Sequence, residues 1–344
     1  MKKEFLSAGI RISLIIATLL VAGCTGPAGY PVSSPGETSI VTPSPSPGAT
    51  GTPGDAGSVA KANNLFAFDL YPALAVLPDT ANRNLFYSPF SLSTALAITG
   101  EGANGKTADE IFSVLHLPKD PVTRRTGFAG LNARLNNASA DYTLRTANAL
   151  WAEKTYAFLP SFTGTARQYY SAETTNLDFS RAPEESRSTI NNWVEEKTEK
   201  KIRDLLPQGS ITPLTRLVIT NAIYFKGTWA RQFDANLTGD ADFTTSSGQV
   251  IKVRMMQDRG EDAKYWYAET ADLQYIELPY FQKTGKSLSM AVLLPKGNDL
   301  SPAEAALSES NLSALKQSAQ HRTEEVYIPK FRVETGNTLA LIQI

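Results

Sequence analysis

The 344-residue chain is close to neutral, with 33 Lys and Arg residues against 34 Asp and Glu residues. Because no cationic excess is available to neutralise phosphates, a nucleic-acid partner is not expected. The two histidines, His116 and His321, and the single cysteine, Cys24, exclude a Cys/His zinc site and an internal disulfide framework, and they disfavour a Ser-His-Asp hydrolase. The sequence therefore predicts neither a metal site nor a cofactor.

Residues 1–23 have the pattern of a secretory signal peptide. Basic residues precede Ile12–Ala22, an apolar run too short for a membrane-spanning helix of about 20 residues. Small residues then lead to a cysteine, and Val21–Cys24 resembles the lipobox of prokaryotic lipoproteins, in which the cysteine thiol is lipidated. We predict that Cys24 anchors a secreted protein to the outer face of the cell membrane through its lipid. An ordinary signal peptide cleaved nearby, with an unmodified cysteine, is the alternative.

Residues 24–58 have the composition of a linker. Of these 35 residues, 25 are Pro, Gly, Ser or Thr, and only Glu37 and Asp55 carry charge. Such a segment cannot bury a core, so it is expected to stay extended and disordered, with a span of roughly 30–35 Å. We interpret it as a stalk that holds a globular domain, residues 59–344, off the membrane.

The globular part mixes helices and strands without strict alternation. Apolar residues at helical spacing and capping sequences predict helices at about 65–77, 88–98, 107–115, 184–206 and 301–319. In the first helix, Pro72 is expected to introduce a kink or to begin a new helix. Alternating or continuous apolar runs predict strands at 84–87, 142–151, 217–225, 250–256, 265–268, 274–278, 289–294 and 325–331. A run of helices followed by a run of strands indicates an α+β fold.

Six segments resemble motifs of the serpin family and occur in the order of that family. They are the segments NLFYSPFSLS (84–93), EGANGKTADE (101–110), INNWVEEKTEKKI (190–202), TNAIYFKGTW (220–229), LPY (278–280) and VYIPKF (326–331). Each motif alone is moderate evidence, but six in order across residues 59–344 identify the chain as similar to serpins.

The resemblance implies a fold of three β-sheets surrounded by helices. It also implies a protein that is not an enzyme and that inhibits serine proteases, and sometimes cysteine proteases, by a suicide mechanism. An exposed reactive loop is cleaved to an acyl-enzyme and then inserts as a new strand into the central sheet, which distorts the attached protease.

The resemblance also assigns roles to four residues. Ser88, Ser91 and Asn221 match the "shutter", a polar cluster beneath the middle of the central sheet, where strands part. Trp229 matches the "breach", the end of the sheet at which insertion begins. The alternatives are a capped helix start with a static strand asparagine, and an ordinary aromatic residue at a strand end.

The sequence departs from the family at its end, because Thr338–Ile344 has the character of an unfinished helix or strand. The family places the next central strand with its shutter histidine, the reactive loop and two core strands beyond this point. Two interpretations are open: the sequence is an incomplete part of a full-length serpin, or the short chain is the real gene product. We expect the chain as written to lack inhibitory activity and to expose strand edges. A non-inhibitory serpin-fold binding protein and a lipid-anchored solute-binding protein are the alternative functions.

Overall fold

The central feature of the structure, a computed structural model, is a mixed sheet with the strand order β1-β4-β2-β3. The structure describes residues 18–22, 53–78, 80–81, 83–137, 139–245, 247–283, 288–297 and 299–333. The strands of this sheet are β1 (Thr18–Ala22), β2 (Tyr142–Glu153), β3 (Ala172–Leu177) and β4 (Thr215–Gly227). The two long strands, β2 and β4, run antiparallel, and β3 lies parallel to β2.

β4 is buried along most of its length because both faces of the sheet are covered. Leu217 and Ile219 of β4, together with Leu150 of β2, pack against helices on one face. The residues between them, such as Val218 and Trp151, point to the opposite face and pack against another helix. The predicted strand with two covered faces is therefore confirmed.

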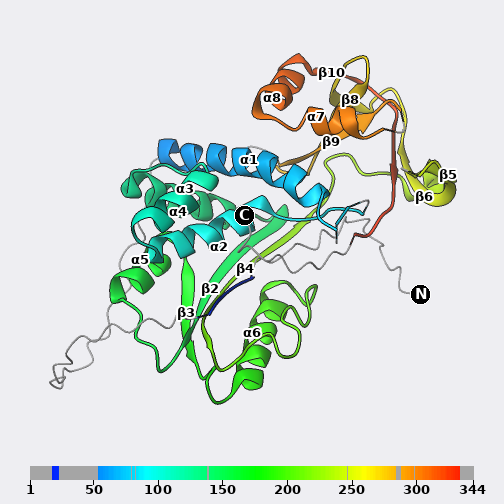
Figure 1. Cartoon of the computed structure of the whole chain (residues 1–344). Helices are drawn as coiled ribbons and strands as arrows, with labels where there is room; N and C mark the ends of the chain where they lie inside the picture. The colour runs from blue at the N-terminus through cyan, green and yellow to red at the C-terminus, as the bar shows by residue number, and fades with distance from the viewer. Residues whose placement is uncertain are drawn as a thin grey trace, which may run out of the picture.

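Helices cover the two faces unequally. Helices α1 to α5 gather on one face of the central sheet, and α6 covers the other (Figure 1). The helices are α1 (Pro53–Ala75), α2 (Pro89–Gly102), α3 (Gly105–Val114), α4 (Pro121–Leu135), α5 (Pro160–Tyr170), α6 (Pro183–Lys197), α7 (Ser301–Ala305) and α8 (Glu309–Ser318).

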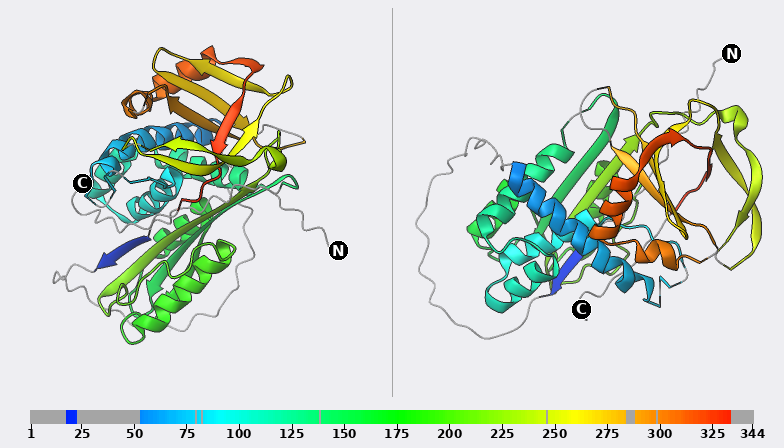
Figure 2. Two further views of the ribbon diagram at one scale, coloured as in Figure 1. Left: turned by 90° about the vertical axis from the view of Figure 1, so that its right-hand side faces the viewer. Right: turned by 90° about the horizontal axis from the view of Figure 1, so that it is seen from above.

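Two smaller antiparallel sheets stand at the end of the molecule away from α6 (Figure 2). One has the order β10-β7-β8-β9, and its strands are β7 (Lys264–Glu269), β8 (Leu273–Pro279), β9 (Ser289–Pro295) and β10 (Gln320–Thr323). The other has the order β11-β6-β5, and its strands are β5 (Gly239–Thr244), β6 (Val250–Asp258) and β11 (Val326–Pro329). A single turn of 3-10 helix, Ala235–Leu237, precedes β5. The three sheets and the surrounding helices confirm the predicted α+β class.

The structure differs from the predictions at three places near the start of the domain. The first helix begins at Pro53, so residues 53–58 are helical and do not belong to the linker. This helix also continues through Pro72 to Ala75, so no new helix begins at the proline. Residues 84–87 form no strand, because they serve as the extended lead into the Ser88 cap of α2. The remaining linker residues and Cys24 lie outside the described residues.

Three further helix predictions need correction. α3 begins at Gly105, because Asn104, not Thr107, caps it. α6 ends at Lys197 instead of continuing to residue 206, since Glu199 and Lys200 adopt left-handed φ values of 49° and 60°, which no α-helix accommodates. The helix predicted at 301–319 is two helices, α7 and α8, which are separated at Ser308, the N-cap of α8.

Candidate functional site

A buried polar cluster lies between α2 and the central sheet, in the middle of the apolar core. α2 begins at Ser88, whose hydroxyl accepts a hydrogen bond from the backbone N–H of Ser91 at 3.2 Å, and Pro89 follows in the first turn. This arrangement is an N-cap, which provides an acceptor for a free N–H group at the helix start. Ser88, Ser91 and Thr94 are all buried and follow each other at intervals of three residues, so they lie along one side of α2.

The sheet contributes two asparagines to this cluster. Asn221 of β4 is fully buried and lies directly opposite Asn148 of β2 in the strand register. The Asn221 amide nitrogen donates to Asn148 Oδ1 at 2.6 Å, and Asn148 Nδ2 donates to the carbonyl oxygen of Tyr170 at 2.8 Å. A chain of two amides therefore links β4 through β2 to the C-terminal end of α5.

Three buried polar atoms of this layer have no hydrogen-bond partner in the part of the chain that the structure describes. They are Ser91 Oγ, Thr94 Oγ1 and Asn221 Oδ1. Leaving a buried polar atom without a partner costs about 1–3 kcal/mol, and such atoms are rare in native proteins. The structure thus places the predicted residues Ser88, Ser91 and Asn221 in neighbouring layers, α2 packing on β4, although no hydrogen bond between described atoms joins the serines to the asparagine.

The opposite face of the same two strands is fully paired. Trp151 Nε1 donates to Thr220 Oγ1 at 3.0 Å, and the Trp151 ring meets the edge of Trp193 on α6 with the ring centroids 5.6 Å apart. Trp193 in turn donates to Glu173 of β3 at 3.0 Å. Trp193 therefore packs between α6 and the central sheet.

Trp229, the predicted breach residue, follows β4 and is 4% exposed. It forms an isolated antiparallel bridge with Tyr280, and the two rings stack with centroids 4.5 Å apart. Phe225 meets Tyr280 edge-on at 4.8 Å. Gly227 allows this packing, because a Cβ atom there would lie only 2.8 Å from the Tyr280 ring. Burial raises the pKa of Tyr280 to about 12, and Trp229 Nε1 is a further buried atom without a partner among the described residues.

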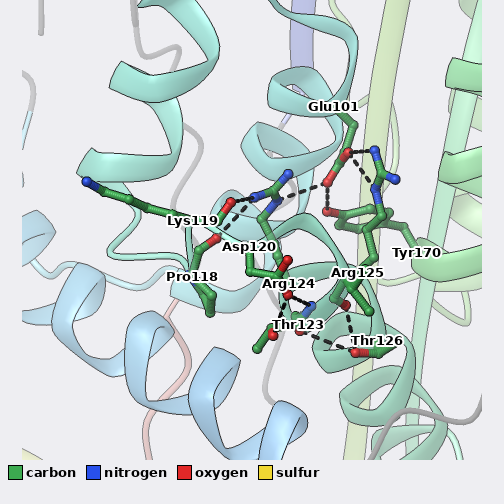
Figure 3. A network of polar contacts seen from close by, with 10 residues as sticks. Glu101, Pro118, Lys119, Asp120, Thr123, Arg124, Arg125, Thr126 and Tyr170 are labelled. Carbon is green, nitrogen blue, oxygen red and sulfur yellow. Dashed lines mark hydrogen bonds and ion pairs between the residues drawn. The ribbon is translucent and has the colours of Figure 1, made fainter.

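A second buried polar network joins α2, α4 and α5 (Figure 3). The Glu101 carboxylate accepts hydrogen bonds from Arg124 Nε at 3.0 Å, Arg125 Nε at 2.9 Å and the Tyr170 hydroxyl at 3.0 Å. Arg124 also donates to the carbonyl oxygens of Pro118 and Lys119, and its guanidinium lies 3.6 Å from the ring centroid of Phe112. These contacts hold α4 in place. Because both oxygens of the Glu101 carboxylate accept hydrogen bonds, we interpret Glu101 as a structural residue.

Neither histidine forms a hydrogen bond with either cluster in the described part of the chain. His116 follows the C-cap of α3 with a left-handed φ of 54°, and its Nε2 lies 2.6 Å from Asp69 Oδ2 on α1. His321 lies on β10 beside Trp266, with ring centroids 5.4 Å apart. Among the described residues, no group of His, Cys, Asp and Glu side chains could hold a metal ion.

Asn148 and Tyr280 are the functional candidates that sequence reasoning missed. Asn148 sits in a run predicted only as a strand, and nothing in its local sequence distinguishes it from a surface asparagine. Tyr280 belongs to the serpin-like motif LPY (278–280). Its stacking on Trp229, however, depends on a pairing across more than 50 residues.

Comparison with known proteins agrees with this architecture. A profile of the serpin (serine protease inhibitor) family matches residues 61–342. An uncharacterised serpin-like protein of Methanosarcina mazei is 39% identical over 283 residues, which cover 82% of this chain and 65% of the relative. The leukocyte elastase inhibitor of Bos taurus is also 39% identical and is covered to 74%. The chain therefore spans about two thirds of the length of the curated relatives that it matches.

Solved structures give the same result. Emu ovalbumin superposes with a TM-score of 0.73 at 30% identity, covering 79% of this chain and 73% of the ovalbumin chain. A cleaved Serpin 42Da superposes with a TM-score of 0.72, also at 30% identity, covering 80% and 72% of the two chains. The chain belongs to the serpin family, whose fold the three sheets and their helices display. The family is described as one of serine protease inhibitors, and the bovine relative carries the name of an elastase inhibitor.

Proposed function

We propose that the complete protein is a suicide inhibitor of serine proteases, and that its cleaved loop inserts as a strand along the outer edge of β4. The observation that supports this proposal is the strand pairing at the two edges of β4. β2 occupies one edge of β4, and β1 lies antiparallel along the other, from Thr18 opposite Thr220 to Ala22 opposite Thr215. β1 lies within the range predicted to be removed as a signal peptide. In the processed protein, the same edge would be available to another strand.

Inhibition is tested by incubating the complete secreted protein with a panel of serine proteases and one cysteine protease. A covalent complex that resists boiling in detergent is expected with at least one serine protease, and its mass should equal the protease plus the cleaved inhibitor. The control is the same protease with its active-site serine blocked, which should give no such complex. Cleavage of the protein with full recovery of protease activity would contradict inhibition and favour a substrate or a binding protein.

The proposal includes the shutter role of Ser88, Ser91 and Asn221 and the breach role of Trp229. Replacing Asn221 by Leu removes the donor to Asn148 and leaves the Asn148 oxygen unpaired, so we expect a loss of about 1–3 kcal/mol in the free energy of unfolding. A shutter role predicts, in addition, a changed rate of complex formation. Thr220→Val is the matched control, because it breaks one hydrogen bond between the same strands on the opposite face. An equal effect of both variants on that rate would contradict the assignment.

We further propose that Cys24 carries the lipid that anchors the protein at the cell surface. The support for this proposal comes from the lipobox-like sequence alone. Residues 24–52 lie outside the described part of the chain. No described helix has both the length and the apolar character needed to cross a membrane. Cys24→Ala should release the protein into the medium or leave its precursor uncleaved, as measured by fractionation and intact mass. Unchanged membrane partition together with unchanged mature mass would refute the anchor.

A further inference from the structure

The sequence contains three segments of the form Asn-Xaa-Ser/Thr, which is the acceptor sequence for N-linked glycans in secreted proteins. They begin at Asn137, Asn236 and Asn311, and none of them belongs to the residues assigned to inhibition. Because such short sequences also arise by chance, the surroundings of each asparagine decide whether it is a usable acceptor. A usable acceptor is exposed, and its amide nitrogen is not engaged by another part of the chain.

Asn311 does not meet this requirement. It lies in the first turn of α8, where its amide nitrogen donates to the carbonyl oxygen of Ala305 at 2.9 Å. Its backbone N–H donates to Oγ of the N-cap Ser308 at 3.2 Å. The nitrogen atom that would bond to the sugar is therefore already engaged. Asn137 supports no structural argument, since Ala138 in its segment lies outside the described residues.

Asn236 meets the requirement. It is an exposed residue of the 3-10 turn Ala235–Leu237, and no hydrogen bond engages its side chain in the described part of the chain. Other groups hold the turn. The backbone N–H of Asn236 donates to Asp234 Oδ1 at 2.8 Å, and that of Thr238 donates to the carbonyl oxygen of Ala235 at 3.3 Å. A sugar on the Asn236 amide would therefore break none of these contacts.

We propose that Asn236 is an N-glycosylation site, which accepts an oligosaccharide from a lipid-linked phosphate donor. In this group transfer, a bond forms between Asn236 Nδ2 and the anomeric carbon of the sugar, and the bond from that carbon to the phosphate oxygen breaks. Nδ2 loses one proton, the phosphate leaves with its lipid carrier, and nothing is oxidised or reduced. The Thr238 hydroxyl completes the acceptor sequence. The modification requires that the protein is secreted, but it does not require that it inhibits proteases.

The position of Asn236 gives the glycan a role, because β5 begins three residues later, at Gly239. β5 is the edge strand of the sheet β11-β6-β5, and no described strand pairs with its outer edge. At the far end of the β5–β6 hairpin, Phe243 lies opposite Ile251, and these residues are 40% and 38% exposed. An exposed edge strand with apolar side chains is a template for aggregation. A bulky, solubilising glycan beside it would keep other chains away.

The test uses the protein purified from the cells that produce it. Its intact mass should exceed that of the processed polypeptide by one glycan, beyond any lipid, and peptide mass spectrometry should place the glycan on Asn236. Thr238→Val should remove the glycan although Asn236 remains, whereas Thr238→Ser should keep it, because serine retains the hydroxyl. Asn311→Gln is the matched control, and it should retain the glycan.

The shielding of β5 is tested by heating the same proteins and recording light scattering. Asn236→Gln should aggregate at a lower temperature than the native protein, and Asn311→Gln should aggregate at the native temperature. Equal aggregation temperatures for the native protein and Asn236→Gln would contradict the shielding.

Two results would overturn the glycosylation site itself. One is native protein in which Asn236 carries no sugar, and the other is a glycan that persists in Thr238→Val. A glycosylated protein that inhibits no protease would contradict the proposed function alone. An inhibitor without a sugar on Asn236 would contradict the glycosylation site alone, so the two proposals fail in different assays.

Discussion

Two buried carboxylates of this domain, those of Glu101 and Glu153, are stabilised in different ways. The Glu101 side chain is 1% exposed and has two guanidinium partners, Arg124 and Arg125, in addition to the Tyr170 hydroxyl. Glu153, at the end of β2, is also 1% exposed as a residue, but its hydrogen-bond partners are neutral. It accepts from the backbone N–H and the hydroxyl of Thr155 and from those of Ser180, at 2.8–3.3 Å.

The difference shows what each carboxylate does for the fold. Glu101 joins three helices from distant parts of the chain by charge, which requires two cations to be buried or half-buried with it. Glu153 lies where β2 ends in a turn. It connects this turn to the loop before α6 by hydrogen bonds alone. Burial by itself would raise the pKa of Glu153, but the hydrogen bonds from Thr155, Ser180 and Phe179 outweigh it, and the pKa lies below its usual range.

The largest effect is expected from Glu101→Gln. The substitution keeps the shape of the side chain but leaves the Arg124 charge, which is 5% exposed, without a counter-ion. Breaking a buried ion pair in this way costs about 3–5 kcal/mol, which denaturant unfolding would measure. The control is Glu110→Gln, whose ion pair with Lys106 is exposed and should contribute less than about 1 kcal/mol. Equal losses for the two variants would show that burial does not distinguish them.

A smaller loss is expected from Glu153→Gln, because no buried cation is left behind. The amide group of glutamine can accept at only one of its two polar atoms, so at least one of the donors from Thr155 and Ser180 loses its acceptor. We expect a loss of about 1–3 kcal/mol in the same measurement. A loss as large as that of Glu101→Gln would contradict the view that charge compensation separates the two sites.

The dependence of stability on pH sharpens the comparison. The pKa of Glu153 is lowered on folding, so its contribution is present above the unfolded pKa, about 4.3, and is lost as the pH falls through the folded value. The slope from one group is at most about 1.4 kcal/mol per pH unit. Glu153→Gln should therefore flatten the decline of stability below about pH 4. An unchanged acid limb in this variant would contradict the assignment.

The alkaline limb reports on the Glu101 network through Tyr170. Burial, together with the neighbouring Glu101 charge, raises the pKa of Tyr170 well above its usual value. Its contribution is fully present below the unfolded pKa, about 10, and is lost as the pH rises through the folded value. Tyr170→Phe should remove this alkaline component, and ultraviolet titration of tyrosinate in the folded state should show one fewer phenol that resists ionisation in the variant than in the native protein. Ionisation of every tyrosine near pH 10 would contradict it.

The smallest effect is expected from Arg125→Met. The Arg125 side chain is 34% exposed, and Arg124 still neutralises Glu101 after its removal. We therefore expect a loss of no more than about 1 kcal/mol in denaturant unfolding, since the methionine retains the apolar stem. A loss close to that of Glu101→Gln would mean that both guanidinium groups are needed to stabilise the buried carboxylate.

The sequence by itself determined the local features of the candidate site. Ser88 followed by Pro89 predicts the cap and first turn of α2, since both residues act on backbone groups within four positions. The apolar run 217–225 predicts a strand with two covered faces, because each residue of such a strand needs an apolar environment. The ordered motifs also identified the family correctly.

Only the tertiary structure decided which distant groups meet. Asn148 and Asn221 are 73 residues apart, and their pairing depends on the register of β2 against β4, because a one-residue slip of either strand would place the two side chains on opposite faces of the sheet. Glu101 gains its partners only because α4 and α5 pack beside α2. Likewise, α6 ends at Lys197 although its helical sequence pattern continues, because Glu199 and Lys200 adopt left-handed backbone conformations. Helix and strand propensities depend on a few neighbouring residues. These contacts, in contrast, depend on how helices and strands from distant parts of the chain pack against one another.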